Sequence, residues 1–293
     1  MRKSRVLIVS KFLYVRGGAE VCAINQAELL RRHGHEVRFF AMRYPENIET
    51  GADEEYFAPE VSFFQPSFAG KLTAAARAFG AGVKAGFEKM LDDFKPDIVH
   101  LHNIHSYLSP IVARIAHQRG IKVLWTLHDY KLLCPSYACL RQGKPCELCF
   151  TDKSKVVSLR CMKGSLSASL LAWAEAVYWN KKKLSAWTDA FIGPSRFMAQ
   201  KMVQGGFPKA KVHSICNFIS DDKLNLISEI PFTEKEQAYA YVGRLSEEKG
   251  IEGVLKVVSR LPYKLYVAGG GPLKEQFVRK YASDRIVFLG HLP

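Results

Sequence analysis

The stretch from Ala240 to Pro272, AYVGRLSEEKGIEGVLKVVSRLPYKLYVAGGGP, constrains the fold of this chain more than any other segment. Its pattern predicts a strand, a polar turn, a helix, a second strand and a glycine turn, because apolar residues recur at helical spacing between two short apolar runs. Arg244 and Lys249 flank the acidic turn after the first strand. An arginine, a lysine and the free N–H groups of a helix start suit a diphosphate. The alternative is a solvated turn in which Glu247 and Glu248 pair with these cations.

The beginning of the chain predicts the opening β-α-β unit of a doubly wound sheet. Arg5–Ser10 and Val37–Ala41 have the composition of strands, and a helix follows Gly17 and Gly18. Two adjacent glycines beside a helix start let a backbone approach a ligand, although a flexible turn also explains them. The pair is not a G-x-G-x-x-G motif directly after a strand, which argues against a nicotinamide dehydrogenase.

Two further strands are expected at Ile98–His102 and Lys122–Leu127. Three histidines cluster at the end of the first of them: His100, His102 and His105. Alternation places the first two on one face of the strand. Because doubly wound sheets bind ligands at the carboxyl ends of their strands, His102 and Asn103 are candidates for contacting an acceptor. A metal site is the alternative, although no nearby carboxylate completes a ligand set.

Charge is unevenly distributed along the chain. Forty-two basic and 28 acidic residues give a net charge of +14, which favours anionic partners. We expect no nucleic-acid binding, because no finger spacing or basic zipper is present. Amphipathic helices are expected over Ser67–Phe94, interrupted by glycines, and over Ser165–Trp187, where aromatic and leucine positions meet the basic triplet Lys181–Lys183. The second region is either a core helix with a solvated basic end or an attachment site for anionic lipid.

Five of the seven cysteines lie within 28 residues, at Cys134, Cys139, Cys146, Cys149 and Cys161. A C-x2-C pair with two further thiols suits a tetrahedral structural zinc site. A reduced, metal-free loop is the alternative, and an intracellular chain would not form disulfides.

Several motifs resemble those of the retaining glycosyltransferases of the GT-B fold, family 4. GRLSEEKG, VAGGGP and FLGHLP resemble the second domain of that family, and GGAE at 17–20 and LHDY at 127–130 resemble its first domain. The resemblance covers nearly the whole chain. It implies an α/β fold of two Rossmann-like doubly wound domains around a cleft. It also implies transfer of a sugar from a nucleotide diphosphate sugar to a hydroxyl of a sugar or lipid-linked acceptor, with retention and without a catalytic metal.

The resemblance also assigns roles to residues. His128 would be catalytic, reaching the donor sugar and helping to hold the transition state. The donor and its diphosphate would be bound by Gly17, Gly18, Gly243, Arg244 and Lys249. The growing negative charge on the leaving diphosphate would be met by the two cations of this set.

The expected domains are an acceptor-side domain at 1–216, a linker at 217–237 and a nucleotide-sugar-binding domain at 238–293. We expect three strands in the last domain, where such a fold carries about five or six. The resemblance places a glycine-rich loop with two glutamates after Pro293, so we expect a C-terminally truncated chain with a partial second domain.

The expected setting is cell-surface polysaccharide or glycolipid synthesis in the cytoplasm or at the inner face of the membrane. No run of about 18 apolar residues is present, and the N-terminus resembles a first buried strand more than a signal peptide. Two alternatives remain for the function. The chain is an inactive fragment or interaction module of such an enzyme, or it is an epimerase or phosphorylase with the same two-domain build.

Overall fold

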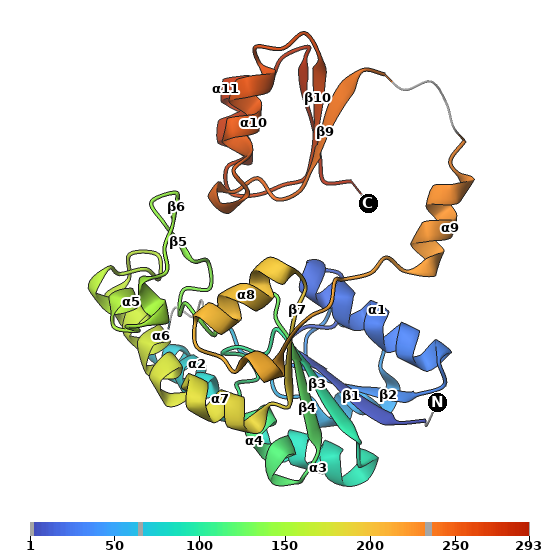
Figure 1. Ribbon diagram of the computed structural model, residues 1–293, viewed down its shortest axis with the longest axis vertical. Coiled ribbons are helices and arrows are strands. Elements are labelled where there is room, and N and C mark those ends of the chain that lie inside the picture. Colours follow the sequence, from blue (N-terminus) through green and yellow to red (C-terminus); the bar gives the residue numbers. More distant parts are fainter. Residues whose placement is uncertain (1–2, 64–66, 232–235, 293) are drawn as a thin grey trace. The chain divides into compact units, whose positions relative to one another are not determined.

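The computed structural model describes residues 3–63, 67–231 and 236–292, which form two compact units (Figure 1). Unit 1 comprises the chain up to residue 139 together with 146–224, and unit 2 comprises 140–145 together with the chain from 225 onward. The boundary after Leu224 falls inside the segment predicted as a linker. A helix, α9 (Asp221–Glu229), occupies part of that segment. Residues 232–235 of the predicted linker, and the last residue of the FLGHLP motif, lie outside the described residues.

Unit 1 is built on a parallel sheet with the strand order β2-β1-β3-β4-β7-β8. The strands are β1 (Arg5–Ser10), β2 (Glu36–Phe40), β3 (Ile98–His102), β4 (Lys122–Thr126), β7 (Ala190–Gly193) and β8 (Val212–Ser214). The order reverses at β1, since the chain adds β2 on one side and then β3 on the other. Such a switch point is where ligands bind in doubly wound sheets, at the carboxyl ends of the strands.

Helices cover both faces of this sheet (Figure 1). They are α1 (Gly18–Arg32), α2 (Phe68–Ala78), α3 (Lys84–Phe94), α4 (Ile111–Gln118), α5 (Lys155–Ser158), α6 (Leu166–Tyr178), α7 (Lys181–Trp187) and α8 (Arg196–Gln204). Ala23 and Ala27 of α1 pack against Ile8 on one face, whereas Val99 and Leu101 belong to the core on the other face. The expected alternation along β3 is therefore confirmed. None of the helices in the described part of the chain is both long and apolar enough to cross a bilayer.

The helical region at 67–94 is divided at its glycines, as expected. Helix α2 ends at Ala78 and α3 begins at Lys84. Gly80 lies between them with a φ of 101°, and a Cβ at this position would come within 2.9 Å of Ile111 Cβ. Glycine is needed here both for its left-handed backbone and for its lack of a side chain.

The single helix expected at 165–187 was wrong, because two helices occupy this region. Asn180 begins the second one, and its side chain accepts a hydrogen bond of 3.1 Å from the Lys183 N–H. An asparagine that caps a helix in this way starts a new axis. The preceding Trp179 is buried, and its indole N–H donates to the Ala78 carbonyl at 2.8 Å. Both contacts stabilise the break.

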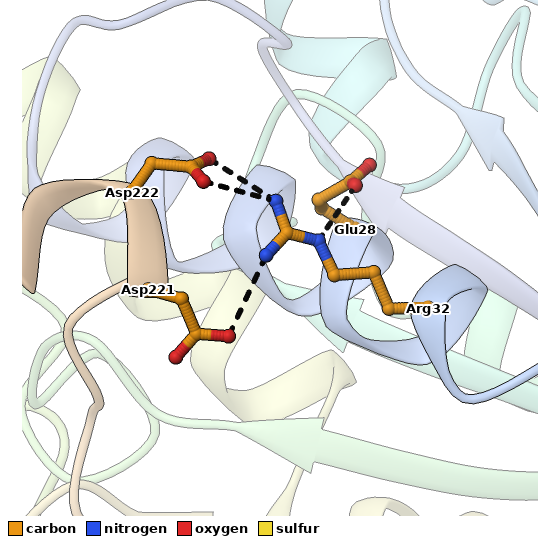
Figure 2. A network of polar contacts seen from close by, with 4 residues as sticks. All are labelled: Glu28, Arg32, Asp221 and Asp222. Atoms are coloured by element: carbon orange, nitrogen blue, oxygen red, sulfur yellow. Dashed lines mark hydrogen bonds and ion pairs between the residues drawn. The ribbon is translucent and has the colours of Figure 1, made fainter. Parts of the chain in front are cut away.

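A cluster of charges ties the start of α9 to α1 within unit 1 (Figure 2). The Arg32 guanidinium lies 3.1 Å from Glu28, 3.5 Å from Asp221 and 3.1 Å from Asp222. Its partners are exposed, so each pair stabilises the fold by only about 0.2–1 kcal/mol. The cluster holds the first turn of α9 beside α1.

Unit 2 contains a three-stranded parallel sheet with the order β11-β10-β9. Its elements are β9 (Ala238–Val242), α10 (Ile251–Val258), β10 (Lys264–Ala268), α11 (Lys274–Tyr281) and β11 (Ile286–Gly290), with the short hairpin β5 (Leu140–Arg141) and β6 (Lys144–Pro145). Leu245, Ile251, Leu255, Val267 and Phe277 form its core. The three strands predicted for this part of the chain and the α/β class are confirmed.

Candidate functional site

Polar side chains gather in unit 1 at the switch point of the sheet. The chain leaves β1 at Lys11 and leaves β3 at Asn103. Lys11 is a residue that the sequence did not single out, and its ammonium lies 5.2 Å from the centre of the Tyr107 ring. Burial lowers the pKa of Lys11, while Glu20 and Asp129 act in the opposite direction. A desolvated cation with acidic neighbours is typical of a ligand-binding edge.

Two of the predicted residues, His102 and His128, contact each other directly. His102 Nδ1 lies 3.0 Å from His128 Nε2, although 26 positions separate the two residues in the chain. His100 lies behind this pair, with its Nε2 2.8 Å from Thr126 Oγ1. Burial lowers the pKa of His128 to about 4 and that of His100 to about 3, and it also lowers the pKa of His102. All three are therefore neutral near pH 7, so each ring has one N–H donor and one acceptor nitrogen.

His102 and His128, together with Cys22 of α1, form a group that could hold a metal ion. Their ligand atoms all lie within 4.8 Å of one another. His102 Nε2 is buried without a hydrogen-bond partner among the described residues. From the sequence, His100 and His105 were the expected neighbours of His102 in a histidine cluster. His105 stacks on Trp125, with 5.4 Å between ring centres, and so takes no part in this group.

The glycine pair lies at the start of α1, as predicted. Gly17 is the N-cap with an extended backbone, and no side chain caps the helix. A Cβ at Gly18 would meet no atom within 4 Å, so packing in this chain does not require glycine there. The open space and the uncapped N–H groups leave room for an anion.

Glu20 joins this helix start to the acceptor-side candidate Asn103. It is 4% exposed, and its carboxylate accepts a hydrogen bond of 3.4 Å from the Asn103 side-chain amide. Acidic residues are common in the first turn of a helix, because they complement its dipole. The GGAE motif includes Glu20, but no role was predicted for its side chain, and its burial beside Asn103 shows that it belongs to the site.

The loop after His128 is held in place by a buried ion pair. Lys131 Nζ lies 2.9 Å from a Glu175 carboxylate oxygen, and the two side chains are 10% and 6% exposed. Ser106 donates to the same carboxylate at 2.8 Å, and Lys131 also donates to the Pro135 carbonyl at 3.0 Å. These contacts connect the loops after β3 and β4 to helix α6.

In unit 2, the predicted cations lie on the turn that follows β9. Gly243 has a φ of 159°, and its N–H donates to the Ala268 carbonyl at 3.0 Å. A Cβ at Gly269 would come within 2.0 Å of the Gly243 oxygen, and one at Gly271 within 2.5 Å of the Leu245 oxygen. The glycine turn thus allows two backbone segments to approach closely, which sets the direction of the Arg244 turn.

Both cations of this turn are available to a ligand. Arg244 is about two-thirds exposed, and its guanidinium is 4.0 Å from Glu248. Within the residues that the structure describes, Lys249 forms no ion pair. Glu248 is instead engaged by Ser246 Oγ, which donates to it at 2.6 Å. Gly250, with a φ of 63°, then leads directly into α10.

The predicted site residues therefore fall into two groups. Gly17, Gly18, His102, Asn103 and His128 lie at the switch point of unit 1, and Gly243, Arg244 and Lys249 lie on one turn of unit 2. In both units the group follows the carboxyl ends of parallel strands, where α/β sheets bind ligands.

Comparisons with known proteins agree with this architecture. Residues 16–223 match the family described as Glycosyltransferase Family 4. A Klebsiella pneumoniae protein described as an uncharacterized 42.6 kDa protein in the cps region is 25% identical over 293 residues, which cover 96% of this chain and 72% of that protein.

Solved structures show the same fold. Anabaena Alr3699/HepE, crystallised with UDP and glucose, has a TM-score of 0.54 at 15% identity, with 99% of this chain and 70% of that one covered. The catalytic domain of starch synthase IV from Arabidopsis thaliana, bound to ADP and acarbose, has a TM-score of 0.59 at 14% identity, with 99% and 74% covered.

Proposed function

Because this chain belongs to glycosyltransferase family 4, we propose that it transfers a sugar from a nucleotide diphosphate sugar to an acceptor hydroxyl with retention of the anomeric configuration. The observation that carries this proposal is the position of both residue groups at the carboxyl ends of parallel strands. The ligands of the similar structures, UDP with glucose and ADP with acarbose, support a nucleotide sugar as the donor.

In this proposal the leaving diphosphate is stabilised by Arg244 and Lys249. Negative charge grows on the diphosphate as the glycosidic bond breaks, and preorganised cations lower the energy of that transition state. Arginine binds phosphate oxygens through two parallel N–H donors, and lysine adds a point charge. Gly243 shapes the turn, and Gly17 and Gly18 offer backbone N–H groups to the donor.

His128 contacts the donor sugar in the proposed reaction. Its Nε2 is engaged by His102, so its Nδ1 is the nitrogen that faces a substrate. A His128 tautomer protonated at Nδ1 accepts a hydrogen bond at Nε2 from His102 Nδ1–H and donates its own Nδ1–H to a sugar hydroxyl. The low pKa of His128 keeps the ring neutral and therefore able to take this form. Asn103, positioned by Glu20, and His102 lie on the acceptor side.

Product analysis tests the function directly. We expect the protein, incubated with UDP-glucose or ADP-glucose and a panel of acceptors, to release the nucleoside diphosphate and form a product with the donor's anomeric configuration. NMR coupling constants of the anomeric proton report that configuration. Conversion of the nucleotide sugar to an isomer without acceptor would instead establish an epimerase. An inverted product, or the absence of any reaction and of any nucleoside diphosphate binding by calorimetry, would contradict the proposal.

Helix α6 supports a membrane-associated role. It buries its small and polar residues, Ser169, Ala172 and Glu175, and exposes large apolar ones. The exposed side chains follow helical spacing along one stripe: Leu166, Leu170, Trp173 and Val177. A core helix would show the reverse pattern, because burial of apolar surface is what stabilises it.

Positive charge accompanies this stripe. Residues 151–211 contain 11 lysines and arginines and 3 acidic residues. Two lysines of the basic triplet contact the protein: Lys183 lies 4.6 Å from the centre of the Tyr178 ring, and Lys181 donates to the Gly205 carbonyl at 2.8 Å. The third, Lys182, is exposed. An exposed apolar stripe within a cationic region suits an anionic bilayer surface. This placement supports a lipid-linked acceptor, which we propose is used in polysaccharide or glycolipid synthesis.

The membrane role makes a measurable prediction. The protein should sediment with vesicles that contain an anionic lipid and much less with neutral vesicles. The double variant Leu170→Gln/Trp173→Gln should weaken binding at least about tenfold, because each apolar side chain contributes roughly 1–3 kcal/mol when buried. Leu226→Gln on α9, which changes an even more exposed leucine elsewhere, should have no effect. Equal sedimentation with both vesicle types, or a double variant that binds like the wild type, would rule out this surface.

A further inference from the structure

One cysteine of helix α1 lies beside the histidine pair of unit 1. Cys22, His102 and His128 each offer one ligand atom, and these three atoms all lie within 4.8 Å of one another. Among the described residues no other three histidine, cysteine or acidic side chains form such a group, and the cysteines at 134–161 are not part of it. The three residues come from α1, from the end of β3 and from the loop after β4, so only the folded unit brings them together. The proposed transfer reaction gives Cys22 no role and does not explain its place in this group.

The distances in this group suit a single metal ion. His102 Nδ1 and His128 Nε2 are 3.0 Å apart. Two nitrogen ligands of a tetrahedral zinc ion, each bonded at about 2.0–2.1 Å, are about 3.3 Å apart. The two rings are therefore already spaced as neighbouring ligands of one ion, and the Cys22 sulfur is near enough to be the third.

The chemistry of the three side chains favours zinc. Burial lowers the pKa of both histidines, so each neutral ring has a lone pair for a metal. Burial also raises the pKa of the Cys22 thiol, which lies 3.4 Å from the side-chain oxygen of Asn217. A thiolate with two imidazoles suits Zn²⁺, whereas Mg²⁺ and Ca²⁺ prefer oxygen ligands. Water or the Asn217 oxygen completes the set of four ligands.

We propose that Cys22, His102 and His128 form a binding site for Zn²⁺, and that the bound ion inhibits sugar transfer. The inhibition rests on the proposed function, whereas the binding does not. On binding, the Cys22 thiol releases its proton to solvent. The His102 proton moves from Nδ1 to Nε2, a nitrogen without a hydrogen-bond partner among the described residues. Each ligand atom then has a lone pair for the ion, no oxidant is needed, and zinc affinity rises with pH.

Inhibition follows from the position of the ion. A tetrahedral ion bonded to both nitrogens lies to one side of the line that joins them, so at least one ring has to turn toward it. His102 is fully buried and His128 is only partly buried, which makes His128 the ring that can turn. Turning aims its Nε2 at the ion and moves its Nδ1 away from the place where, in the proposed reaction, it contacts the donor sugar.

Protection of the Cys22 thiol tests the binding in the wild-type protein. Trypsin releases residues 17–31 and 212–223, which contain Cys22 and Cys216 as their only cysteines. The folded protein is alkylated with N-ethylmaleimide at a buffered free zinc concentration, and mass spectrometry follows both peptides over time. Zinc at about ten times its dissociation constant should slow alkylation of Cys22 about tenfold, because the bound thiolate is withdrawn from the reagent. Cys216, which is exposed, is the internal control, and its rate should stay nearly the same.

Two histidine variants show whether the ring of His128 takes part. His128→Ala removes one ligand from a partly buried position, so it should lose most of the protection of Cys22. His213→Ala removes an exposed histidine elsewhere in unit 1 and should keep that protection. Equal alkylation of wild-type Cys22 with and without zinc would overturn the site, as would full protection in His128→Ala.

Sugar transfer measured at the same zinc concentrations tests the inhibition. Wild-type turnover should fall about tenfold at zinc about ten times its dissociation constant, and a chelator should restore it. Cys22→Ser, compared with its own zinc-free rate, should stay active at that concentration. Protection of Cys22 without any change in turnover would overturn the inhibition. A protein with no transfer activity at all would contradict the proposed function, while the thiol protection still decides the zinc site.

Discussion

Replacing Arg244 by alanine is expected to slow sugar transfer by about 2–4 kcal/mol in activation free energy, which is roughly 30- to 1000-fold in turnover. The reason is the charge that develops on the leaving diphosphate. Arg244 follows the end of β9 and is largely exposed, with its nearest acidic partner at 4.0 Å. Its charge is therefore available to the diphosphate, and the interaction is strongest in the transition state, where the negative charge on the leaving group has grown. Lys249→Ala should have an effect in the same range.

Kinetics with a matched control separates this role from general electrostatics. Arg260 lies just beyond the opposite end of α10 from Lys249, so Arg260→Ala removes the same charge from unit 2 without touching the turn. Its turnover should stay within about twofold of the wild type, because distant exposed charges are screened by salt. Thermal unfolding of all three variants should be similar. If both turn variants turn over like the wild type, the assigned diphosphate site is wrong.

Replacing Glu175 by alanine is expected to lower the free energy of unfolding by about 3–5 kcal/mol, because it leaves the buried Lys131 ammonium without a counter-charge. Ser106 loses its acceptor at the same time. Glu175→Ala should also reduce activity, since this ion pair holds the loop that carries His128. The measurement is urea denaturation followed by tryptophan fluorescence at neutral pH.

Two controls show whether the effect comes from the buried pair. The double variant Lys131→Met/Glu175→Leu should recover most of the lost stability, because replacing both charges with apolar groups leaves nothing uncompensated. Glu28→Ala removes an exposed partner of Arg32 and should cost less than about 1 kcal/mol. A Glu175→Ala protein as stable as Glu28→Ala would show that Lys131 is not buried against this carboxylate.

Secondary structure was largely predictable, because it depends on local spacing. The strands at 5–10, 98–102 and 238–242 were predicted to the residue. The helices at 165–187 were merged, since Asn180 resembles any polar helix residue until its side chain is seen to cap α7. The reversed pattern of α6 escaped notice for a related reason. The periodicity of its sequence shows that α6 has an apolar stripe. It does not show whether that stripe faces the protein core or the solvent.

The residues of the site were only partly predictable. Motifs identified His128 and Arg244, and its place at a strand end identified His102. No role was predicted for Glu20, Lys11 or Glu175, which resemble ordinary surface charges in the sequence. They matter because they are desolvated, and burial is a property of the assembled unit. The glycines at 269 and 271 were read as a turn, whereas the structure shows that they allow two loops to pack backbone to backbone.

By itself, the sequence determined the α/β class, the parallel strands and the segments that carry the polar residues, because periodicity and turn chemistry act over a few residues. Only the tertiary structure decided which of those residues meet. His102 contacts His128 because β3 and β4 are neighbours in register, and Lys131 contacts Glu175 because helix α6 packs against the loop after β4. Such contacts depend on strand order and loop closure, which local sequence patterns do not encode.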